Sequence, residues 1–284
     1  MLISLYHRTT FSYAGKAHDS FNEVRLKPVD DPNQARRSFD LRVDPAATVR
    51  EYLDFYGNTV SYFDVTAEHD RLVIEATSEV ETTPNTSRPA IPPAMLSEGE
   101  GDEMRAEFLA ASPFVPLDPS LWKEAQDALA GGRLDVWSDV RRICGHAYRV
   151  LEYKPRSTAV NTKADEALSI RAGVCQDFAH VALGMCRTSG IACRYVSGYF
   201  INVERRPGET EASHAWIEAH VPGFGWAPFD PTHDRAADDR YVKVASGRDY
   251  ADIRPVNGTY RGGKTRSLSV EVRLRESQAA GSPG

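Results

Sequence analysis

The sequence predicts an α+β fold in which a small antiparallel β-sandwich domain precedes a core of helices packed on an antiparallel sheet. Three observations lead to this prediction. The first 80 residues alternate apolar and polar side chains with the period of two that is typical of strands. Amphipathic helical patterns occupy the middle of the chain, and alternating segments return after residue 192. Such a segregation of strands from helices along the chain indicates an α+β arrangement.

The composition limits the classes of partner. The chain has 284 residues, which is about two domains on the usual size prior. Its formal net charge is −6 and its sequence pI is about 5.8, so we expect neither nucleic acid nor a membrane as a partner. No apolar run approaches the roughly 20 residues that cross a bilayer. The N-terminus alternates like a strand and does not resemble a signal peptide, so we expect a cytoplasmic protein.

Residues 1–80 are expected to form an N-terminal β domain. A strand near the start places alternate residues on one face, and Gly57-Asn58 is a turn signal between two aromatic, β-branched runs. The residues on the shared face of the first strand are Ile3, Leu5, His7, Thr9, Phe11 and Tyr13.

Residues 81–117 are expected to be a linker with one short helix near 102–111. The segment is rich in Pro, Ser, Thr and Glu, a composition that favours an extended connection. A helix then begins at Asp118, a candidate N-cap followed by Pro119 at the first helical position.

Residues 118–275 are expected to form the catalytic core, and residues 276–284 a disordered tail. An amphipathic helix covers residues 136–151, and another begins near Cys175 and stops at Gly190. Antiparallel strands follow, and the last alternating strand, "LSVEVRL", is assigned to this core.

One of the four cysteines has a setting that favours chemistry. Cys144, Cys186 and Cys193 lie in apolar patterns that indicate packing in a core, whereas Cys175 follows Gly173 at a helix start. Unpaired N–H groups and the helix dipole stabilise an anion there, so Cys175 is a candidate nucleophile. All four are expected to be free thiols. No CxxC pair occurs, so we expect no structural zinc site.

A histidine and a carboxylate lie on a hairpin downstream of this helix. The strand "SHAWIEAHV" carries His214, and "WAPFDPT" returns with Asp230 after a Pro-Gly turn. If the hairpin is centred at Pro222, then His214 lies directly opposite Asp230 with Cβ atoms about 5 Å apart. A carboxylate so placed can orient one imidazole nitrogen and leave the other for a thiol. His233 is expected to be peripheral.

The segments "GVCQDFAHVALGMCRTSGIACRYVSGYF" and "SHAWIEAHVPGFGWAPFDPT" resemble the bacterial transglutaminase-like superfamily, over about residues 140–235. "HRTTFSYAGKAHDSFNEVRLKP" is similar to the N-terminal β domain of that family. The resemblance implies a papain-like core with the catalytic order Cys175, His214, Asp230. We expect no cofactor and no metal.

Further site residues are expected around this triad. The resemblance suggests Tyr153 as an oxyanion donor, although a packed tyrosine fits its pattern equally well. Gln176 is a candidate for shaping the substrate groove, whereas Asp177 suits a helix N-terminus by its charge alone. Trp216 is a candidate for lining the cleft, although large aromatic side chains on a sheet more often pack.

The implied activity is cysteine-dependent acyl transfer on a peptide or amide-containing substrate. Hydrolysis is the leading expectation, because the chain ends shortly after the core and has no EF-hand-like loop, unlike the calcium-dependent crosslinking enzymes of the family. Protein-glutamine transamidation is the alternative, since both reactions share a thioester. A non-catalytic peptide-binding module is a third possibility. The sequence does not indicate an oligomeric state.

Overall fold

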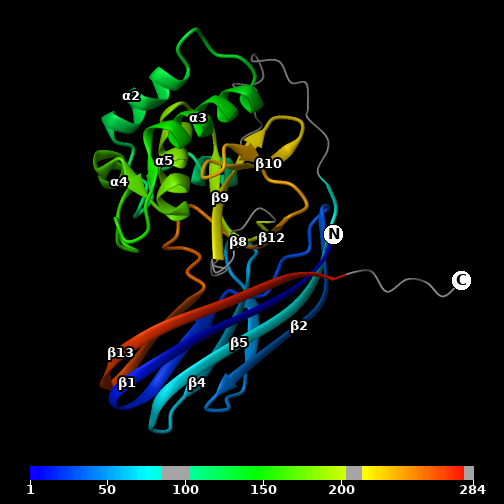
Figure 1. Cartoon of the computed structure of the whole chain (residues 1–284), viewed down its shortest axis with the longest axis vertical. Helices are drawn as coiled ribbons and strands as arrows, with labels where there is room; N and C mark the ends of the chain where they lie inside the picture. Colours follow the sequence, from blue (N-terminus) through cyan, green and yellow to red (C-terminus); the bar gives the residue numbers. More distant parts are fainter. Residues whose placement is uncertain (85–102, 203–212, 278–284) are drawn as a thin grey trace, which may run out of the picture.

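The computed structural model describes residues 1–84, 103–202 and 213–277 of the chain. It shows a mixed architecture of antiparallel sheets and helices, with an N-terminal β region, as the sequence predicts (Figure 1). The expected linker 81–117 falls partly outside the described residues, and so does most of the expected tail. In the described part of the chain, no helix is long and apolar enough to cross a membrane.

An antiparallel sheet forms the lower part of the molecule in Figure 1. Its strands are β1 (Leu2–Val24), β2 (Gln34–Asp44), β3 (Arg50–Leu53), β4 (Thr59–Val65), β5 (His69–Thr82) and β13 (Val256–Ser277). They are hydrogen-bonded in the order β2-β5-β1-β4-β3, and β13 pairs with β1. The first part of β1 pairs with β5 and its end pairs with β4, so this long strand holds the sheet together.

The alternation along β1 decides which side chains face inward. Ile3, Leu5, His7 and Thr9 are all buried, which confirms the predicted face. Ile3 and Leu5 belong to the same core cluster as the helices, so the two halves of the molecule share apolar core. The tight turn before β4 is also confirmed, because Gly57 has a φ of 80° that a residue with a side chain rarely adopts.

The last strand does not belong where the sequence analysis placed it. Residues 256–275 were expected in the catalytic core, but β13 pairs with β1 along its whole length, from Leu2↔Ser277 to Val24↔Val256. Local periodicity identified only the "LSVEVRL" segment, residues 268–274, of this longer strand. It could not identify the partner, because pairing between the two ends of a chain leaves no signal in either strand alone.

Four helices pack together against a second sheet. They are α2 (Pro119–Ala128), α3 (Val136–Val150), α4 (Ala164–Ile170) and α5 (Cys175–Thr188), and the short helix α1 (Glu103–Glu107) precedes them in the chain. The Asp118 side chain accepts a hydrogen bond from Ser120 N at 2.8 Å, which confirms the predicted N-cap of α2. Helix α5 ends before Gly190, whose φ of 75° ends it as predicted.

The second sheet has the order β11-β10-β9-β8-β12. Its strands are β8 (Cys193–Phe200), β9 (Ser213–Val221), β10 (Gly225–Asp230), β11 (Arg235–Ala236) and β12 (Tyr241–Gly247). On the central strand β9, Ala215, Ile217 and Ala219 join the core cluster that contains α5, whereas Trp216 joins a separate cluster. The sheet therefore has one face covered by α5 and an opposite face that carries Trp216. A two-stranded parallel sheet, β6 (Glu152–Tyr153) with β7 (Ala172–Gly173), leads into α5.

Two buried amide side chains attach the N-terminal region to strand β12. Gln34 Nε2 donates to Lys243 O at 2.9 Å, and Lys243 N donates back to Gln34 Oε1 at 2.8 Å. Asn58 makes the same reciprocal pair with the backbone of Ser246, at 2.8 Å in each direction. Each side-chain amide thus makes the two backbone hydrogen bonds, one donated and one accepted, that a neighbouring strand would make. Because a buried donor or acceptor left without a partner costs about 1–3 kcal/mol, these pairs fix how the two regions meet.

Candidate active site

Asp177 and Gly173 shape the first turn of helix α5, which begins at Cys175. Asp177 Oδ2 accepts hydrogen bonds from Val174 N at 2.8 Å and from Thr158 Oγ1 at 2.7 Å, and so closes the first turn. Burial raises the pKa of this carboxyl group. A Cβ at Gly173 would lie 2.5 Å from the Cβ of Asp177, so only glycine fits there. Asp177 therefore has the structural role that its charge suggested, and it presents Cys175 at the head of the helix.

The four cysteines are free thiols, as predicted, but they differ in exposure. Cys144, Cys186 and Cys193 are buried, whereas Cys175 is only half-buried. Burial raises the pKa of Cys144 and Cys186 well above the ordinary value. Neither of those two thiols is suited to ionise. Cys175 alone combines some exposure with a helix N-terminus.

His214 and Asp230 meet beside this cysteine. His214 Nε2 lies 2.8 Å from Asp230 Oδ2, and the Cys175 side chain is close enough to the ring to help raise the pKa of His214. Because Nε2 is bound to the carboxylate, Nδ1 is the nitrogen left for the thiol. The structure thus brings together the three side chains that the sequence analysis selected.

The register that suggested this pairing was wrong by two residues. The hairpin pairs Phe229 with Ile217, which is centred at Gly223 and not at Pro222. Continued by one residue, this register places Asp230 opposite Trp216 and not His214. The side chains still meet, because a shift of two residues keeps every side chain on its face and leaves a diagonal contact in reach.

Asp230 accepts hydrogen bonds from five donors while fully buried, with 0 % exposure. Its Oδ2 accepts from His214 Nε2, from His233 Nδ1 at 2.7 Å and from Tyr241 Oη at 2.8 Å. Its Oδ1 accepts from the backbone N–H groups of Thr232 at 2.8 Å and His233 at 3.3 Å. Such a set of donors holds a carboxylate in its charged form and fixes its orientation.

The two partners shift each other's proton affinity in opposite directions. Burial alone would raise the pKa of Asp230, but the charge and hydrogen bond of His214, together with His233, hold it far below the usual range. Burial would likewise lower the pKa of His214. The charge and hydrogen bond of Asp230 outweigh burial, and with the contact to Cys175 they raise the pKa of His214 to about 10. The imidazole is therefore cationic at neutral pH.

His233 and Tyr241 are site residues that the sequence analysis missed. His233 was expected to be peripheral, but it reaches the same carboxylate oxygen as His214. His233 follows Asp230 by only three residues on a turn, so their contact could have been predicted from the local sequence. Tyr241 comes from β12, and nothing in its sequence neighbourhood points to Asp230.

His214, Asp230 and His233 have the residue types of a metal site. One potential ligand atom from each lies within 4.8 Å of the others. Their closeness is already explained by two histidine–carboxylate hydrogen bonds, of 2.8 and 2.7 Å, to one oxygen. A cation bound there would have to displace both bonds, so this donor set does not fit a resident metal ion.

The remaining candidates occupy different positions around Cys175. Tyr153 is 56 % exposed and lies on β6, whose backbone pairs with Gly173 just before the cysteine. Gln176 uses its side-chain amide to donate to Val160 O at 2.9 Å. Trp216 is only 2 % exposed, and its ring stacks against His214 with a centroid separation of 6.1 Å. Trp216 is therefore packed behind the histidine and does not lie open beside the thiol.

Two family descriptions match the chain. Residues 3–81 match the bacterial transglutaminase-like N-terminal region, and residues 123–231 match the transglutaminase-like superfamily core. The second match spans Cys175, His214 and Asp230.

Full-length relatives also match. An uncharacterized protein of Mycobacterium leprae is 34% identical over 279 residues, covering 94% of this chain and 96% of its own. An uncharacterized protein of Mycobacterium tuberculosis is 33% identical over 288 residues, covering 94% of this chain and 90% of its own.

A solved structure has the same fold. It is a protein of Cytophaga hutchinsonii described as a candidate cysteine protease, with a TM-score of 0.78 and 24% sequence identity. The similarity covers 99% of this chain and 92% of that one, so both sheets and the helices are shared. Together with the family matches over both regions, these comparisons show that the chain belongs to the transglutaminase-like superfamily.

Proposed function

We propose that the protein is a cysteine-dependent acyl-transfer enzyme that hydrolyses amide bonds through a thioester. One observation carries the proposal: His214 binds Asp230 Oδ2 at 2.8 Å and lies beside the Cys175 side chain at the head of α5. A thiol, a base and a group that orients the base are the three parts that nucleophilic cysteine chemistry needs. The fold match to a candidate cysteine protease supports the same reaction class.

In the first step, the Cys175 sulfur attacks the amide carbonyl carbon after its proton has passed to His214 Nδ1. The carbonyl oxygen becomes an oxyanion. The backbone N–H of Cys175 lies in the first turn of α5, where N–H groups have no partner within the helix, so it is a suitable donor to this oxygen. We place the Tyr153 hydroxyl as a second candidate donor, because β6 runs beside Gly173.

In the second step, the oxyanion collapses, the C–N bond breaks and His214 gives its proton to the leaving amine. The acyl group is now a thioester of Cys175. Water then attacks the thioester while His214 takes one of its protons, and the thiol is restored as the carboxylic acid leaves. Asp230 keeps its charge throughout, holding the imidazole ring in place and stabilising its cationic form.

Peptide products distinguish the proposed hydrolysis from its alternatives. A peptide library is incubated with the protein, with and without a primary amine, and is analysed by mass spectrometry. We expect new chain ends or deamidated glutamine in both samples, since water resolves the thioester. Adducts of the amine as the main product would instead assign transamidation. A Cys175→Ala variant that gives the same products would contradict the enzyme assignment.

Thiol reactivity separates an enzyme from a non-catalytic binding module. Iodoacetamide at neutral pH is expected to label Cys175 while sparing Cys144, Cys186 and Cys193, which are buried. Labelling is located by peptide mapping. A folded protein in which Cys175 reacts no faster than the other three would favour the inert module.

A further inference from the structure

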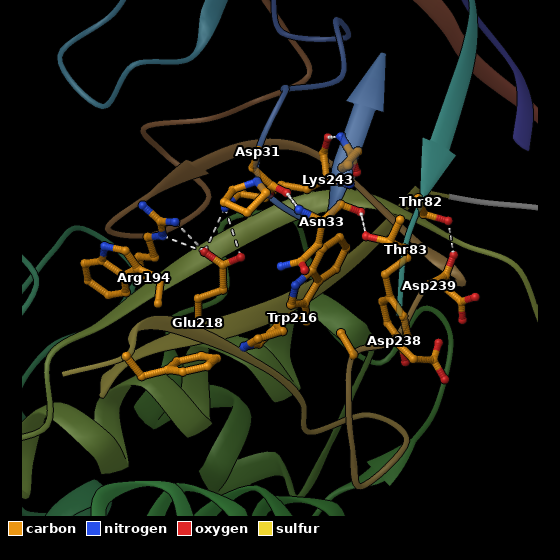
Figure 2. Close-up of a pocket in the computed structure, with 17 residues that line it drawn as sticks. Asp31, Asn33, Thr82, Thr83, Arg194, Trp216, Glu218, Asp238, Asp239 and Lys243 are labelled. Atoms are coloured by element: carbon orange, nitrogen blue, oxygen red, sulfur yellow. Dashed lines mark hydrogen bonds and ion pairs between the residues drawn. The ribbon is translucent and has the colours of Figure 1, made fainter. Parts of the chain in front are cut away.

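A pocket lies on the face of the β8–β12 sheet that is turned away from α5 (Figure 2). Its volume is about 440 Å³, within the range of small-molecule sites. One wall is the sheet, and the other is the loop at Asp31–Gln34 with Thr82 and Thr83 of the N-terminal region. The pocket therefore sits where the two regions of the molecule meet, and it does not include Cys175.

The floor of this pocket carries more positive than negative charge. Glu218, on β9, accepts from Arg194 at 2.6 Å and from Lys243 Nζ at 2.9 Å, and all three side chains line the pocket (Figure 2). Two cations thus share one carboxylate. Arg194 uses Nε and Nη2 on Glu218 and Lys243 uses two of its protons, which leaves donors of both cations for a ligand.

The same floor contains a buried donor without a partner. Trp216 lines the pocket next to Glu218 along β9, and its Nε1 has no hydrogen-bond partner among the described residues (Figure 2). The side chain is 2 % exposed. Because an unsatisfied buried donor costs about 1–3 kcal/mol, its position calls for an acceptor oxygen.

Three further carboxylates line the pocket, and two of them have cationic partners of their own. Asp238 is bound by Arg235 and by Arg240, the latter at 2.8 Å. Asp239 lies 3.9 Å from the amino group of Met1. The charges of Asp238 and Asp239 are therefore balanced locally. Asp31, the third of these carboxylates, accepts a hydrogen bond from Asn33 N at 2.8 Å. The excess positive charge is confined to the group formed by Glu218, Arg194 and Lys243.

The walls around this floor are apolar and aromatic. Arg194 lies over the ring of Trp226, 4.4 Å from its centroid, which fixes one aromatic plate beside the cation. The other apolar side chains that line the pocket are Pro32, Phe224, Pro228, Ala237 and Tyr241. A ligand must accordingly combine an anionic acceptor with an apolar body.

We infer that this pocket is a binding site for a small carboxylate that bears an aromatic or apolar group. The carboxylate would accept from Trp216 Nε1 and from the free donors of Arg194 and Lys243, and the apolar body would lie against Trp226 and Phe224. The pocket does not include Cys175, His214 or Asp230, although Trp216 and Tyr241 line it and also contact that proposed active site. Its occupation does not depend on the proposed reaction.

The test measures binding of N-acetylphenylalanine to the Cys175→Ser protein by isothermal titration calorimetry. We expect a Kd of about 1 mM or tighter for a ligand of this size. N-acetylphenylalanine amide, which has the same body without the charge, is expected to bind at least about tenfold more weakly, since charged hydrogen bonds are the stronger ones. Equal affinity for acid and amide would overturn the inference.

Variants assign the binding to this pocket. Lys243→Met removes one cation and is expected to weaken binding of the acid at least about tenfold, whereas Lys16→Met, which removes a cation from an exposed pair with Asp70, is the matched control. Asn33→Trp blocks the mouth from an exposed position and keeps the buried ion pairs, so it serves if Lys243→Met does not fold. Binding that survives Asn33→Trp would contradict the site.

The outcome is separable from the proposed function. Wild-type protein alkylated at Cys175 has a blocked thiol, and it is expected to bind N-acetylphenylalanine as the serine variant does. Loss of binding on alkylation would place the ligand at the candidate active site and overturn the inference. Absence of amide hydrolysis in the wild-type protein would leave the binding result unaffected.

Discussion

His214, beside Cys175, and His180, within the helix that Cys175 begins, are both buried, yet the protein gives their rings opposite electrostatic settings. His214 lies at the start of β9 and binds Asp230, and its pKa is raised to about 10. His180 lies within α5, and burial together with the Arg187 charge lowers its pKa to about 3. At neutral pH the first ring is a cation and the second is neutral.

The difference comes from the hydrogen bonds made by the buried aspartate that lies near each histidine. Asp230 directs Oδ2 to His214. Near His180, the fully buried Asp249 instead accepts hydrogen bonds from two backbone donors. These are Phe114 N at 2.6 Å and Ala251 N at 2.8 Å. The ring of His180 instead accepts from Tyr250 N at 3.3 Å. Burial alone therefore does not predict a histidine's role, whereas the carboxylate that it meets does.

The largest expected effect is the difference between Cys175, in the candidate active site, and the cysteines buried in the core. Cys175→Ala removes the nucleophile, so turnover in the peptide assay should fall to background. Cys186→Ala, in the buried part of the same helix, should keep turnover within a few-fold and lower the free energy of unfolding by about 1 kcal/mol through lost packing. Equal loss of turnover in both variants would contradict the contrast.

The next comparison is between the two aspartates. Asp230→Asn should lower kcat by about 10²–10⁴, because a general base that is no longer held and charged loses most of its contribution. Asp249→Asn should leave kcat within a few-fold and act on stability, since its contacts are to backbone N–H groups. Steady-state kinetics and thermal unfolding of both variants separate the two roles. A drop of similar size in kcat for Asp249→Asn would show that the two aspartates do not differ in function.

The two histidines should also shape stability against pH in opposite directions. His214 has a folded pKa above its unfolded value near 6.5, so its contribution is complete below pH 6.5 and is lost as pH rises toward about 10. His180 has a folded pKa below that value, so stability is lost as pH falls from about 6.5 toward about 3. Each limb has a slope of up to about 1.4 kcal/mol per pH unit.

Substitution of each ring tests this assignment. His214→Gln should flatten the alkaline limb and leave the acid limb, and His180→Gln should do the reverse. Urea unfolding between pH 4 and pH 10 measures both. Loss of the alkaline limb in His180→Gln would reverse the assignment.

The smallest expected effect concerns the donors that hold Asp230. Tyr241→Phe removes one of three donors to Oδ2 and keeps the ring, so the free energy of unfolding should fall by about 1 kcal/mol. We expect kcat to fall less than in Asp230→Asn, because His233 and His214 still hold the carboxylate. Chemical unfolding and kinetics check both values. A loss as large as that of Asp230→Asn would make Tyr241 as important as the aspartate itself.

The sequence was most informative where function and local pattern coincide. Cys175 has a helix start on one side and a glycine on the other, and His214 and Asp230 lie on adjacent strands of one hairpin, so each has a signal within about twenty residues of the chain. Even a register error of two residues did not move them to the wrong face.

Long-range partners could not be predicted in the same way. Tyr241 reaches Asp230 from β12, and β13 crosses to pair with β1 at the other end of the chain. Neither segment differs in pattern from a strand with any other partner, because tertiary context decides which strands pair. His233 is the intermediate case, since its spacing from Asp230 is local but a histidine on a turn is usually only exposed.

The central claim is that Asp230 keeps His214 cationic beside Cys175, and the ring nitrogens of His214 report it most directly. In ¹⁵N-histidine-labelled protein, the NMR signals of His214 are followed from pH 5 to pH 11 in the wild type and in Asp230→Asn. The account predicts an imidazolium that titrates near pH 10 in the wild type and well below that in the variant. A His214 ring that titrates near 6.5 in both proteins would contradict it.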